Sequence, residues 1–362
     1  MPRRTATMLA STLMLFALLC AGVFMKAPYS EMSPGPTVNT LGDSRGEPVL
    51  NISGHKTYPT TGHLNMTTVR VTGADYDMNL LEAVYGWASG DNIVVPHENL
   101  YPDGKTEQES TQENAEEFSQ SQESAKVAAL KQIGIPVAAR VIVASVVKDS
   151  PSEGKLHAGD VIKAVDGTPV KAPEDVAKLV TKHKPGEPVV FTIVPAAEAA
   201  EAEKAHLEPT GTTKVTIAGK AEGDGHAVVG IRAGTDHTFP FTIDIKLADV
   251  GGPSAGLMFA LGIVDKLTPE NLTGGKFIAG TGTIDDAGKV GPIGGIQMKT
   301  IGARQAGAQY FLTPAENCAA AAGDVPDGLT LVKVSTIDDA VKALEKISKG
   351  DTAGLTRCSA KP

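Results

Sequence analysis

This 362-residue chain is poor in the residues and motifs that hold metals or nucleotides. Its three cysteines lack the spacing of metal ligands, and neither a His-Glu-x-x-His motif nor a complete phosphate-loop motif occurs. The net charge is −9, and because the first 30 residues carry three basic groups and no acid, the remainder carries −12. A body this acidic repels polyanions. We therefore expect no metal, no cofactor, no nucleotide hydrolysis and no nucleic-acid partner.

One long apolar segment lies near the N-terminus. Residues 6–25 contain no charged side chain and, as a helix, are long enough to cross the ~30 Å hydrocarbon core of a bilayer. Arg3 and Arg4 precede the segment, so the positive-inside rule predicts a cytoplasmic N-terminus and an exported body. A cleaved signal peptide is the alternative, although the segment lacks a clean cleavage site. A lipoprotein signal is disfavoured because the bulky Leu19 precedes Cys20.

The segment that follows predicts a turn, two strands and a helix. Residues 33–36, Ser-Pro-Gly-Pro, predict a stiff turn beside the membrane, because proline cannot continue the helix. Residues 48–53 and 63–72 are strand-like, and side-chain character alternates in the second run. An acidic loop then leads into a helix predicted over residues 113–132.

Residues 137–194 follow the order strand, turn, strand, helix, strand. The pattern predicts strands over 140–147, 161–165 and 189–194 and a helix over 173–182. An Asp-Gly pair at 166–167 between two β-branched runs is typical of a hairpin. An Ala/Glu-rich insertion at 196–206 precedes a further strand at 214–218, and we expect both to complete the same sheet.

The middle of this segment resembles a PDZ domain. The resemblance is carried by Ser-Pro at 150–151, Gly-Lys-Leu-His-Ala-Gly-Asp at 154–160 and Ile-Lys-Ala-Val-Asp-Gly at 162–167. It implies that an extended peptide binds as an added strand beside a carboxylate-binding loop, expected near residues 134–137. The alternative is a PDZ fold that only packs against its neighbour.

Residues 225–349 alternate predicted strands and helices, beginning with strands over 227–232 and 239–246. Within this segment, the glycine-rich sequence at 251–256 leads directly into residues 257–264, which are apolar on every face and therefore predict a buried helix. Ser254 lies at the N-terminus of that helix, where backbone N–H groups around Gly252 and Ser254 can stabilise an oxyanion. A phosphate-binding turn is the alternative for these glycines.

A nucleophilic serine needs a base, and the sequence favours a lysine. Residues 252–256 also fit the G-x-S-x-G motif, but that fold requires a histidine after the serine, and the last histidine, His237, precedes it. Lys299 lies in a predicted helix on an apolar, open face beside Ile296 and Ala303. Desolvation there lowers the pKa of the amine and leaves part of it neutral.

The C-terminal segment resembles the proteolytic domain of Lon-type proteases. Three motifs carry the resemblance, Gly-Pro-Ser-Ala-Gly at 252–256, Thr-Gly-Thr-Ile at 281–284 and Gly-Pro-Ile-Gly-Gly-Ile-Gln-Met-Lys at 291–299. The resemblance implies a Ser254–Lys299 catalytic dyad that Thr281 assists. The acid that often precedes the serine by three residues is replaced by Gly251, which leaves the role of nearby Asp249 open. No ATPase module is recognisable.

The whole chain resembles bacterial membrane-anchored PDZ–Lon-like proteins, which implies an α+β fold. That fold would combine a single N-terminal transmembrane helix, a β-rich PDZ-like domain and a Lon-type proteolytic α/β domain. The expected parts are 1–26 for the cytoplasmic tip and anchor, 27–123 for an extracytoplasmic region, 124–220 for the PDZ-like domain, 221–349 for the proteolytic domain and 350–362 for a tail. The strands at 48–72 resemble an opening hairpin of the proteolytic fold, so the PDZ-like domain can be nested within it.

These features predict a serine endopeptidase that needs no ATP and cleaves unfolded or extended polypeptide outside a bacterial plasma membrane. The PDZ-like domain would present or gate the substrate. A non-catalytic peptide-binding scaffold at the membrane is the alternative. Lon-type domains often form rings, so a homo-oligomer is expected by analogy alone.

Two cysteines of the exported part, Cys318 and Cys358, are expected to form a disulfide. An oxidising compartment favours the bond, whereas Cys20 lies in the anchor and is not expected to pair with either. The alternative is two free thiols, one at the start of a helix and one in a frayed tail.

Overall fold

The computed structural model describes residues 3–102, 106–205, 207, 209–221, 225–248 and 250–360. The chain divides into two compact units. Unit 1 combines Met1–Gly134 with Ile243–Pro362, and unit 2 is Ile135–Thr242. Asp249, whose role the sequence leaves open, lies outside the described residues.

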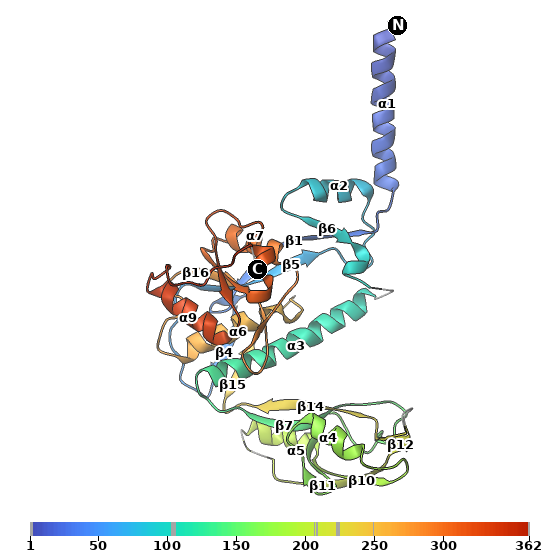
Figure 1. Ribbon diagram of the computed structural model, residues 1–362, viewed down its shortest axis with the longest axis vertical. Helices are drawn as coiled ribbons and strands as arrows, with labels where there is room; N and C mark the ends of the chain where they lie inside the picture. The colour runs from blue at the N-terminus through green and yellow to red at the C-terminus, as the bar shows by residue number, and fades with distance from the viewer. Residues whose placement is uncertain are drawn as a thin grey trace. The chain divides into compact units, whose positions relative to one another are not determined.

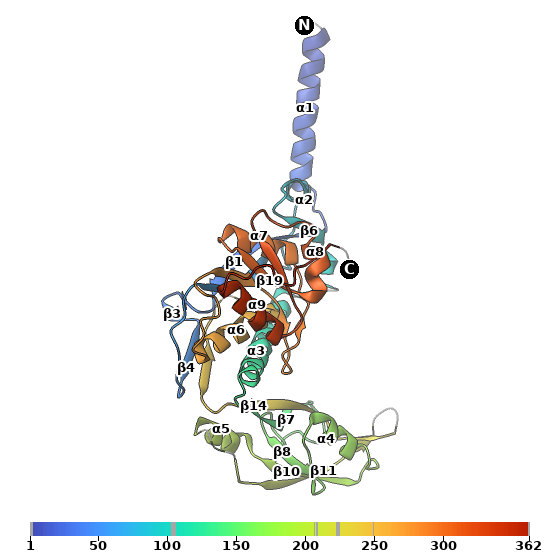
Figure 2. The ribbon, with the colours of Figure 1, turned by 60° about the vertical axis from the view of Figure 1, so that its left-hand side comes forward.

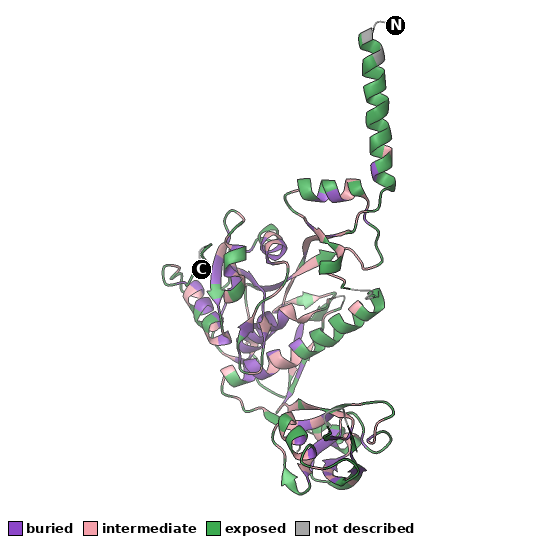
Figure 3. Ribbon diagram, turned by 45° about the vertical axis from the view of Figure 1, so that its right-hand side comes forward, coloured by how far each residue is buried: buried purple, intermediate pink, exposed green. Residues whose placement is uncertain are grey.

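The N-terminal helix α1 (Arg3–Phe24) agrees with the apolar segment expected at residues 6–25. Nearly all of its described side chains are exposed, and Figure 3 draws most of the helix as exposed. Its apolar window, Thr7–Phe24, is long enough to cross a membrane and equally fits a signal sequence.

A six-stranded mixed sheet forms the centre of unit 1 (Figure 1), in the order β20-β19-β16-β5-β1-β6. Its strands are β1 (Tyr29–Asn39), β5 (His63–Val71), β6 (Ile93–Pro96), β16 (Phe277–Gly280), β19 (Tyr310–Pro314) and β20 (Thr330–Val334). Strand β16 pairs in parallel with both β5 and β19. Strands from before and after unit 2 in the sequence therefore share one sheet.

The turn expected at residues 33–36 is wrong. These residues lie within β1, which pairs antiparallel with β5 and has an irregularity in register between Pro34 and Thr37. A Cβ on Gly35 would come within 2.2 Å of the Thr68 hydroxyl oxygen, so only glycine allows the strands to approach this closely. The two prolines are tolerated because the irregularity interrupts the regular ladder of hydrogen bonds at this point.

Four helices of unit 1 pack around the sheet and the segment that contains Ser254. They are α3 (Glu107–Gln132), α6 (Gly256–Leu267), α7 (Ile296–Gln305) and α9 (Ile337–Ser348). Helix α6 packs against α3 and α9, and the three lie close together in Figure 2. Every residue of α6 except Lys266 is buried, as the apolar run at 257–264 predicts for most of the helix.

The remaining elements of unit 1 are short. They are α2 (Leu80–Ala88), α8 (Cys318–Ala321), η1 (His97–Asn99), η2 (Pro253–Ala255), η3 (Ala315–Asn317), β2 (Asp43–Ser44), β3 (Glu47–Pro48), β4 (Leu50–Ser53), β17 (Thr283–Ile284) and β18 (Val290–Gly291). Strand β4 pairs with β15 (Thr242–Ile245), at the return of the chain from unit 2.

Unit 2 contains a second sheet in the order β11-β10-β8-β7-β14, with a short strand β9 beside β8. Its elements are β7 (Ala138–Val146), β8 (Val161–Val165), β9 (Thr168–Pro169), α4 (Pro173–Val180), β10 (Pro188–Val194), α5 (Ala196–Lys204), β11 (Thr213–Ala218), β12 (Lys220–Ala221), β13 (Ala227–Val228) and β14 (Ile231–Thr238). Its core includes Val143, Leu156 and Phe191.

The boundaries of unit 2 differ from the expected limits of 124 and 220. The long helix α3 belongs to unit 1, and β14, expected in the proteolytic domain, pairs antiparallel with β7 of unit 2. Local sequence pattern indicates that a segment is a strand but carries no information on which distant strand pairs with it.

Candidate functional site

The turn before α6 places the Ser254 side chain. Gly252 has a φ of +81°, a conformation that favours glycine, and Pro253 then begins the 3₁₀ turn η2. The Ser254 carbonyl oxygen accepts hydrogen bonds from the Gly282 N–H at 2.9 Å and from the Thr281 hydroxyl at 3.0 Å. The turn is therefore fixed to the segment that follows β16.

Helix α7 brings the Lys299 amine to this serine. Lys299 Nζ lies 2.6 Å from Ser254 Oγ and 3.1 Å from Thr281 Oγ1, and the side chain is 2% exposed. Within the described residues Lys299 forms no ion pair, so no carboxylate offsets the loss of water around its charge. Burial alone lowers the pKa of the amine to about 8.

A cleft of about 280 Å³ opens beside Ser254 and Lys299. Its walls come from β1, β5 and the η2 turn, and its lining residues are Pro36, Met66, Thr68, Val69, Arg70, Val250, Gly251, Ser254, Ala255 and Lys299. Among the residues that the structure describes, no group of three or more His, Cys, Asp or Glu side chains is arranged to hold a metal ion.

The two expected oxyanion donors differ in their surroundings. The Gly252 N–H donates to the Asn114 carbonyl oxygen of α3 at 2.8 Å, so that it is already occupied in this structure. Ser254 lies in the first turn of η2, where a backbone N–H has no intrahelical acceptor. Helix α3 also donates from Ser121 Oγ to the Pro253 carbonyl oxygen at 2.8 Å. The turn that carries Ser254 is thus held on its other side by α3.

The structure brings Ser254, Lys299 and Thr281 into one hydrogen-bonded group. The contribution of α3 could not be predicted from the sequence, because Asn114 and Ser121 lie in an acidic, polar stretch with no sign of a site. The strand β5 is predicted, but its role in the site is not. His237 lies on β14 of unit 2.

Unit 2 has its own groove of about 880 Å³ between α4 and β14. The groove is lined by residues 147–151, by parts of α4 including Val176, Ala177 and Val180, and by residues 227–233. It is therefore not formed by residues 134–137, where a carboxylate-binding loop was expected. The groove lies elsewhere because β14, the last strand of the unit in sequence, forms the sheet edge beside α4 and lines the groove together with that helix.

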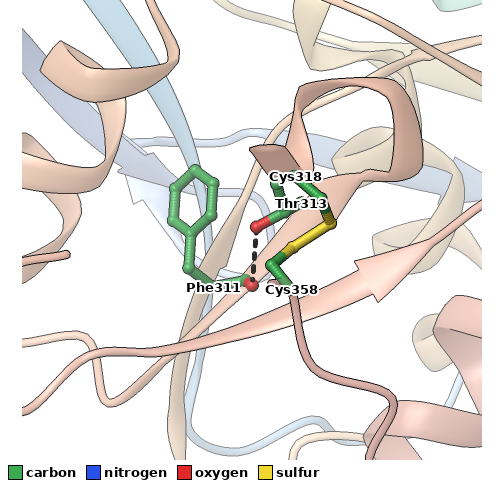
Figure 4. Close-up of a disulfide and its surroundings, with 4 residues drawn as sticks. All are labelled: Phe311, Thr313, Cys318 and Cys358. Atoms are coloured by element: carbon green, nitrogen blue, oxygen red, sulfur yellow. Dashed lines mark hydrogen bonds between the residues drawn. A yellow bond between two sulfur atoms is a disulfide. The ribbon is translucent and has the colours of Figure 1, made fainter. Parts of the chain in front are cut away.

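A disulfide joins Cys318 of α8 to Cys358, with the Cα atoms 5.0 Å apart (Figure 4). The tail around Cys358 is held beside β20 by backbone bonds from Lys333 N–H to Thr356 O and from Cys358 N–H to Leu331 O. Cys358 also packs against the apolar cluster that contains Phe311 and Ile296, the first residue of α7. The tail thus supports the helix that carries Lys299.

Two protein families match separate parts of the chain. Residues 110–203 match the PDZ domain family, and residues 248–346 match the Lon protease (S16) C-terminal proteolytic domain. A solved PDZ domain of an SdrC-like protein from Listeria innocua is 25% identical and covers 28% of this chain and 99% of its own, with a TM-score of 0.21.

Curated relatives match the C-terminal part. A Lon protease of Azospirillum brasilense is 39% identical over 95 residues, which are 25% of this chain and 11% of the relative. Lon protease 1 of Bacillus subtilis is 34% identical over 95 residues, 25% of this chain and 12% of the relative. The match thus spans about a tenth of the length of these relatives. The chain contains a PDZ domain and a Lon-type (S16) C-terminal proteolytic domain, within an α+β fold that carries one N-terminal apolar helix.

Proposed function

We propose that this protein is a serine endopeptidase with Ser254 as nucleophile and Lys299 as general base. The observation that carries the proposal is the 2.6 Å contact between Lys299 Nζ and Ser254 Oγ in a site where burial lowers the pKa of the amine to about 8. A lysine of ordinary pKa is almost entirely protonated at neutral pH and cannot accept a proton. The match to a proteolytic domain supports the same chemistry.

In this mechanism the neutral Lys299 amine takes the hydroxyl proton as Ser254 Oγ attacks the peptide carbonyl carbon. The tetrahedral oxyanion is stabilised by the Ser254 N–H and by the Gly252 N–H, which exchanges the Asn114 carbonyl for the substrate. The Lys299 ammonium then protonates the leaving amine as the C–N bond breaks. A water molecule attacks the acyl-serine with Lys299 again as base, and the proton returns to Ser254 Oγ.

Thr281 acts as a positioning residue. Its hydroxyl accepts from Lys299 Nζ and donates to the Ser254 carbonyl oxygen. One side chain therefore fixes both the direction of the amine and the backbone of the nucleophile turn. The hydroxyl does not itself touch the scissile bond in this proposal.

The substrate proposed is unfolded or extended polypeptide, cleaved without ATP. Strand β14 forms an edge of the unit 2 sheet and borders the α4 groove, so an extended chain can add to it as a further strand. The PDZ domain would thereby present or gate substrate. ATP independence rests on the sequence, which contains no complete phosphate-loop motif.

The location proposed is the outer side of a bacterial plasma membrane. Helix α1 would cross the bilayer once, with its basic N-terminal end in the cytoplasm. The disulfide between Cys318 and Cys358 is consistent with an oxidising compartment.

Cleavage of a reduced and alkylated, unfolded protein tests the proposal. We expect the chain to cleave it at the same rate with and without ATP, and Ser254→Ala to abolish cleavage. Ser53→Ala, at an exposed position of β4, is the matched control and should retain full activity. Equal cleavage by wild type and Ser254→Ala would refute the assignment. Binding of the unfolded protein without cleavage by any variant would favour the scaffold alternative.

A further inference from the structure

Helix α2 (Leu80–Ala88) turns an apolar face to the outside of unit 1. Its exposed large side chains are Leu80 at 37%, Val84 at 49%, Tyr85 at 72% and Trp87 at 56% exposed. Its small residues Ala83 and Gly86 are buried instead. This is the reverse of the usual amphipathic surface helix, whose apolar face is directed toward the core.

The one charged residue of α2 does not interrupt this face. The Glu82 carboxylate accepts from the Asn79 N–H at 2.9 Å and from the Tyr76 hydroxyl at 3.0 Å. The Asn79 side chain accepts from the Glu82 N–H, which completes a capping box. The Glu82 carboxylate is therefore occupied by hydrogen bonds at the start of the helix and does not lie on the exposed apolar face.

Helix α2 lies at the foot of α1, and Figure 1 draws the two crosswise. The Leu80 N–H donates to the Met25 carbonyl oxygen at 3.0 Å. A Cβ on Gly22 of α1 would come within 3.0 Å of the Leu81 side chain, so the two helices are in direct contact. The exposed face of α2 therefore lies near the end of α1, where Phe24 and Met25 are also exposed.

Helix α2 is also firmly attached to the sheet of unit 1. The Trp87 ring packs edge-on against Tyr29 of β1 with centroids 5.2 Å apart, and Trp87 Nε1 donates to the Val94 carbonyl oxygen of β6 at 3.4 Å. Met78, Ala83 and Val94 form a small buried cluster beneath the helix. The apolar face is therefore presented by a packed helix.

We propose that α2 lies in the headgroup–acyl boundary of the bilayer that α1 spans, as a second, in-plane membrane contact. Tyrosine and tryptophan favour this boundary because their rings are apolar and each carries one polar group. Lys26, which follows α1, is paired with Asp77, so apolar insertion rather than attraction to anionic lipid drives the contact. The inference rests on the membrane anchor in the proposed function.

Two attachments constrain a protein more than one does. Helix α1 alone would leave the rest of unit 1 free to rotate about the end of the span, whereas an in-plane helix fixed to β1 and β6 removes that freedom. The cleft at Ser254 belongs to the same unit, so its height above the bilayer would be fixed as well.

The chain offers a direct probe, because Trp87 is its single tryptophan. The full chain is reconstituted into phosphatidylcholine vesicles with or without bromine on the acyl chains near the headgroup. We expect brominated lipid to lower Trp87 emission about twofold, since an interfacial helix is buried ~5–10 Å into this boundary. Quenching should be unchanged by high salt.

Variants separate membrane contact from other causes. Val84→Lys with Tyr85→Lys should restore emission in brominated vesicles, whereas Val325→Lys, at another exposed valine, should leave quenching intact. Thermal unfolding checks that the variants fold. Cleavage in detergent should be unaffected by either change, so failure here is distinguishable from failure of the dyad.

Three outcomes would overturn the inference. In the first, the chain floats with the vesicles but Trp87 is not quenched. In the second, Trp87 is shielded from water only at high protein-to-lipid ratio, which would indicate that a second copy of this chain covers the α2 face. In the third, the chain fails to float, which would remove the membrane anchor as well.

Discussion

The Lys299 amine contacts the hydroxyl groups of Ser254 and Thr281, and within the described residues it has no carboxylate partner. A carboxylate would stabilise the ammonium form and raise the pKa of the amine, which would remove the proposed base. Two hydroxyl groups direct the amine without supplying charge. Burial can therefore lower the pKa to about 8 while the position of Nζ stays fixed.

The pH dependence of cleavage follows from this pKa. Below pH 8 the amine is mostly protonated and cannot take the Ser254 proton, so activity should rise with pH with a midpoint near 8. Lys299→Arg should be inactive at every working pH, since a guanidinium does not deprotonate. Initial rates on a short peptide between pH 6 and 10 provide the measurement.

Lys289→Arg is the control for this profile, because Lys289 is exposed in the loop between β17 and β18. The Lys289→Arg variant should retain both the wild-type cleavage rate and the wild-type pH midpoint of activity. A flat profile in the wild type, or activity in Lys299→Arg, would exclude Lys299 as the base.

The cysteine pair permits a second prediction on single residues. The bond closes a loop of 40 residues, for which chain entropy suggests about 3–4 kcal/mol of stabilisation. Cys358→Ser should lower the free energy of unfolding in denaturant by that amount. Non-reducing digestion followed by mass spectrometry should recover the linked peptides. If Cys358 is fully alkylated without reductant, the bond is absent in solution.

Individual elements differ in how far their sequences predict them. Helix α6 could be predicted in both type and burial, because its apolar run is too short to span a membrane and a short helix that is apolar on every face lies in a core. Ser254 and Lys299 could be singled out because glycines precede the one and apolar neighbours surround the other. The sequence pattern predicts a turn at residues 33–36 and places β14 in the proteolytic domain. Both predictions are wrong, because each of these segments pairs with a strand that is distant in the sequence.

The groove between α4 and β14 can be tested at the scale of these elements. Ala177 lines it from α4 and is exposed, so Ala177→Trp should fill the groove without disturbing the core. We expect KM for an unfolded protein to rise about tenfold, equivalent to about 1.4 kcal/mol, with kcat on a short peptide unchanged.

Ala177→Ser is the matched control and should leave both parameters near wild type. If Ala177→Trp has the same KM for the unfolded protein as wild type, the groove does not take part in substrate binding. If the short-peptide rate falls as well, the change has acted on the proteolytic unit instead.

At the scale of the whole molecule, unit 2 is an insertion in the sequence of unit 1. Strands β1, β5 and β6 precede it, and β16, β19 and β20 follow it. The contact between β5 and β16 joins the two halves of the sheet, with Met66 opposite Gly280. Residues of both halves also line the cleft, including Thr68 from the first and Ser254 from the second.

A fragment that begins at Gly225 should therefore fail to fold, although it contains Ser254, Thr281 and Lys299. Strand β16 would lose its partner β5, and the sheet would end in an unpaired, apolar edge. The matched comparison replaces residues 135–242 with a Gly/Ser linker of about 15 residues, which spans roughly 20 Å. That chain keeps all six strands and should unfold cooperatively in denaturant and cleave a short peptide. Cooperative unfolding and cleavage by the fragment from Gly225 would show instead that the strands before unit 2 are dispensable for the proteolytic fold.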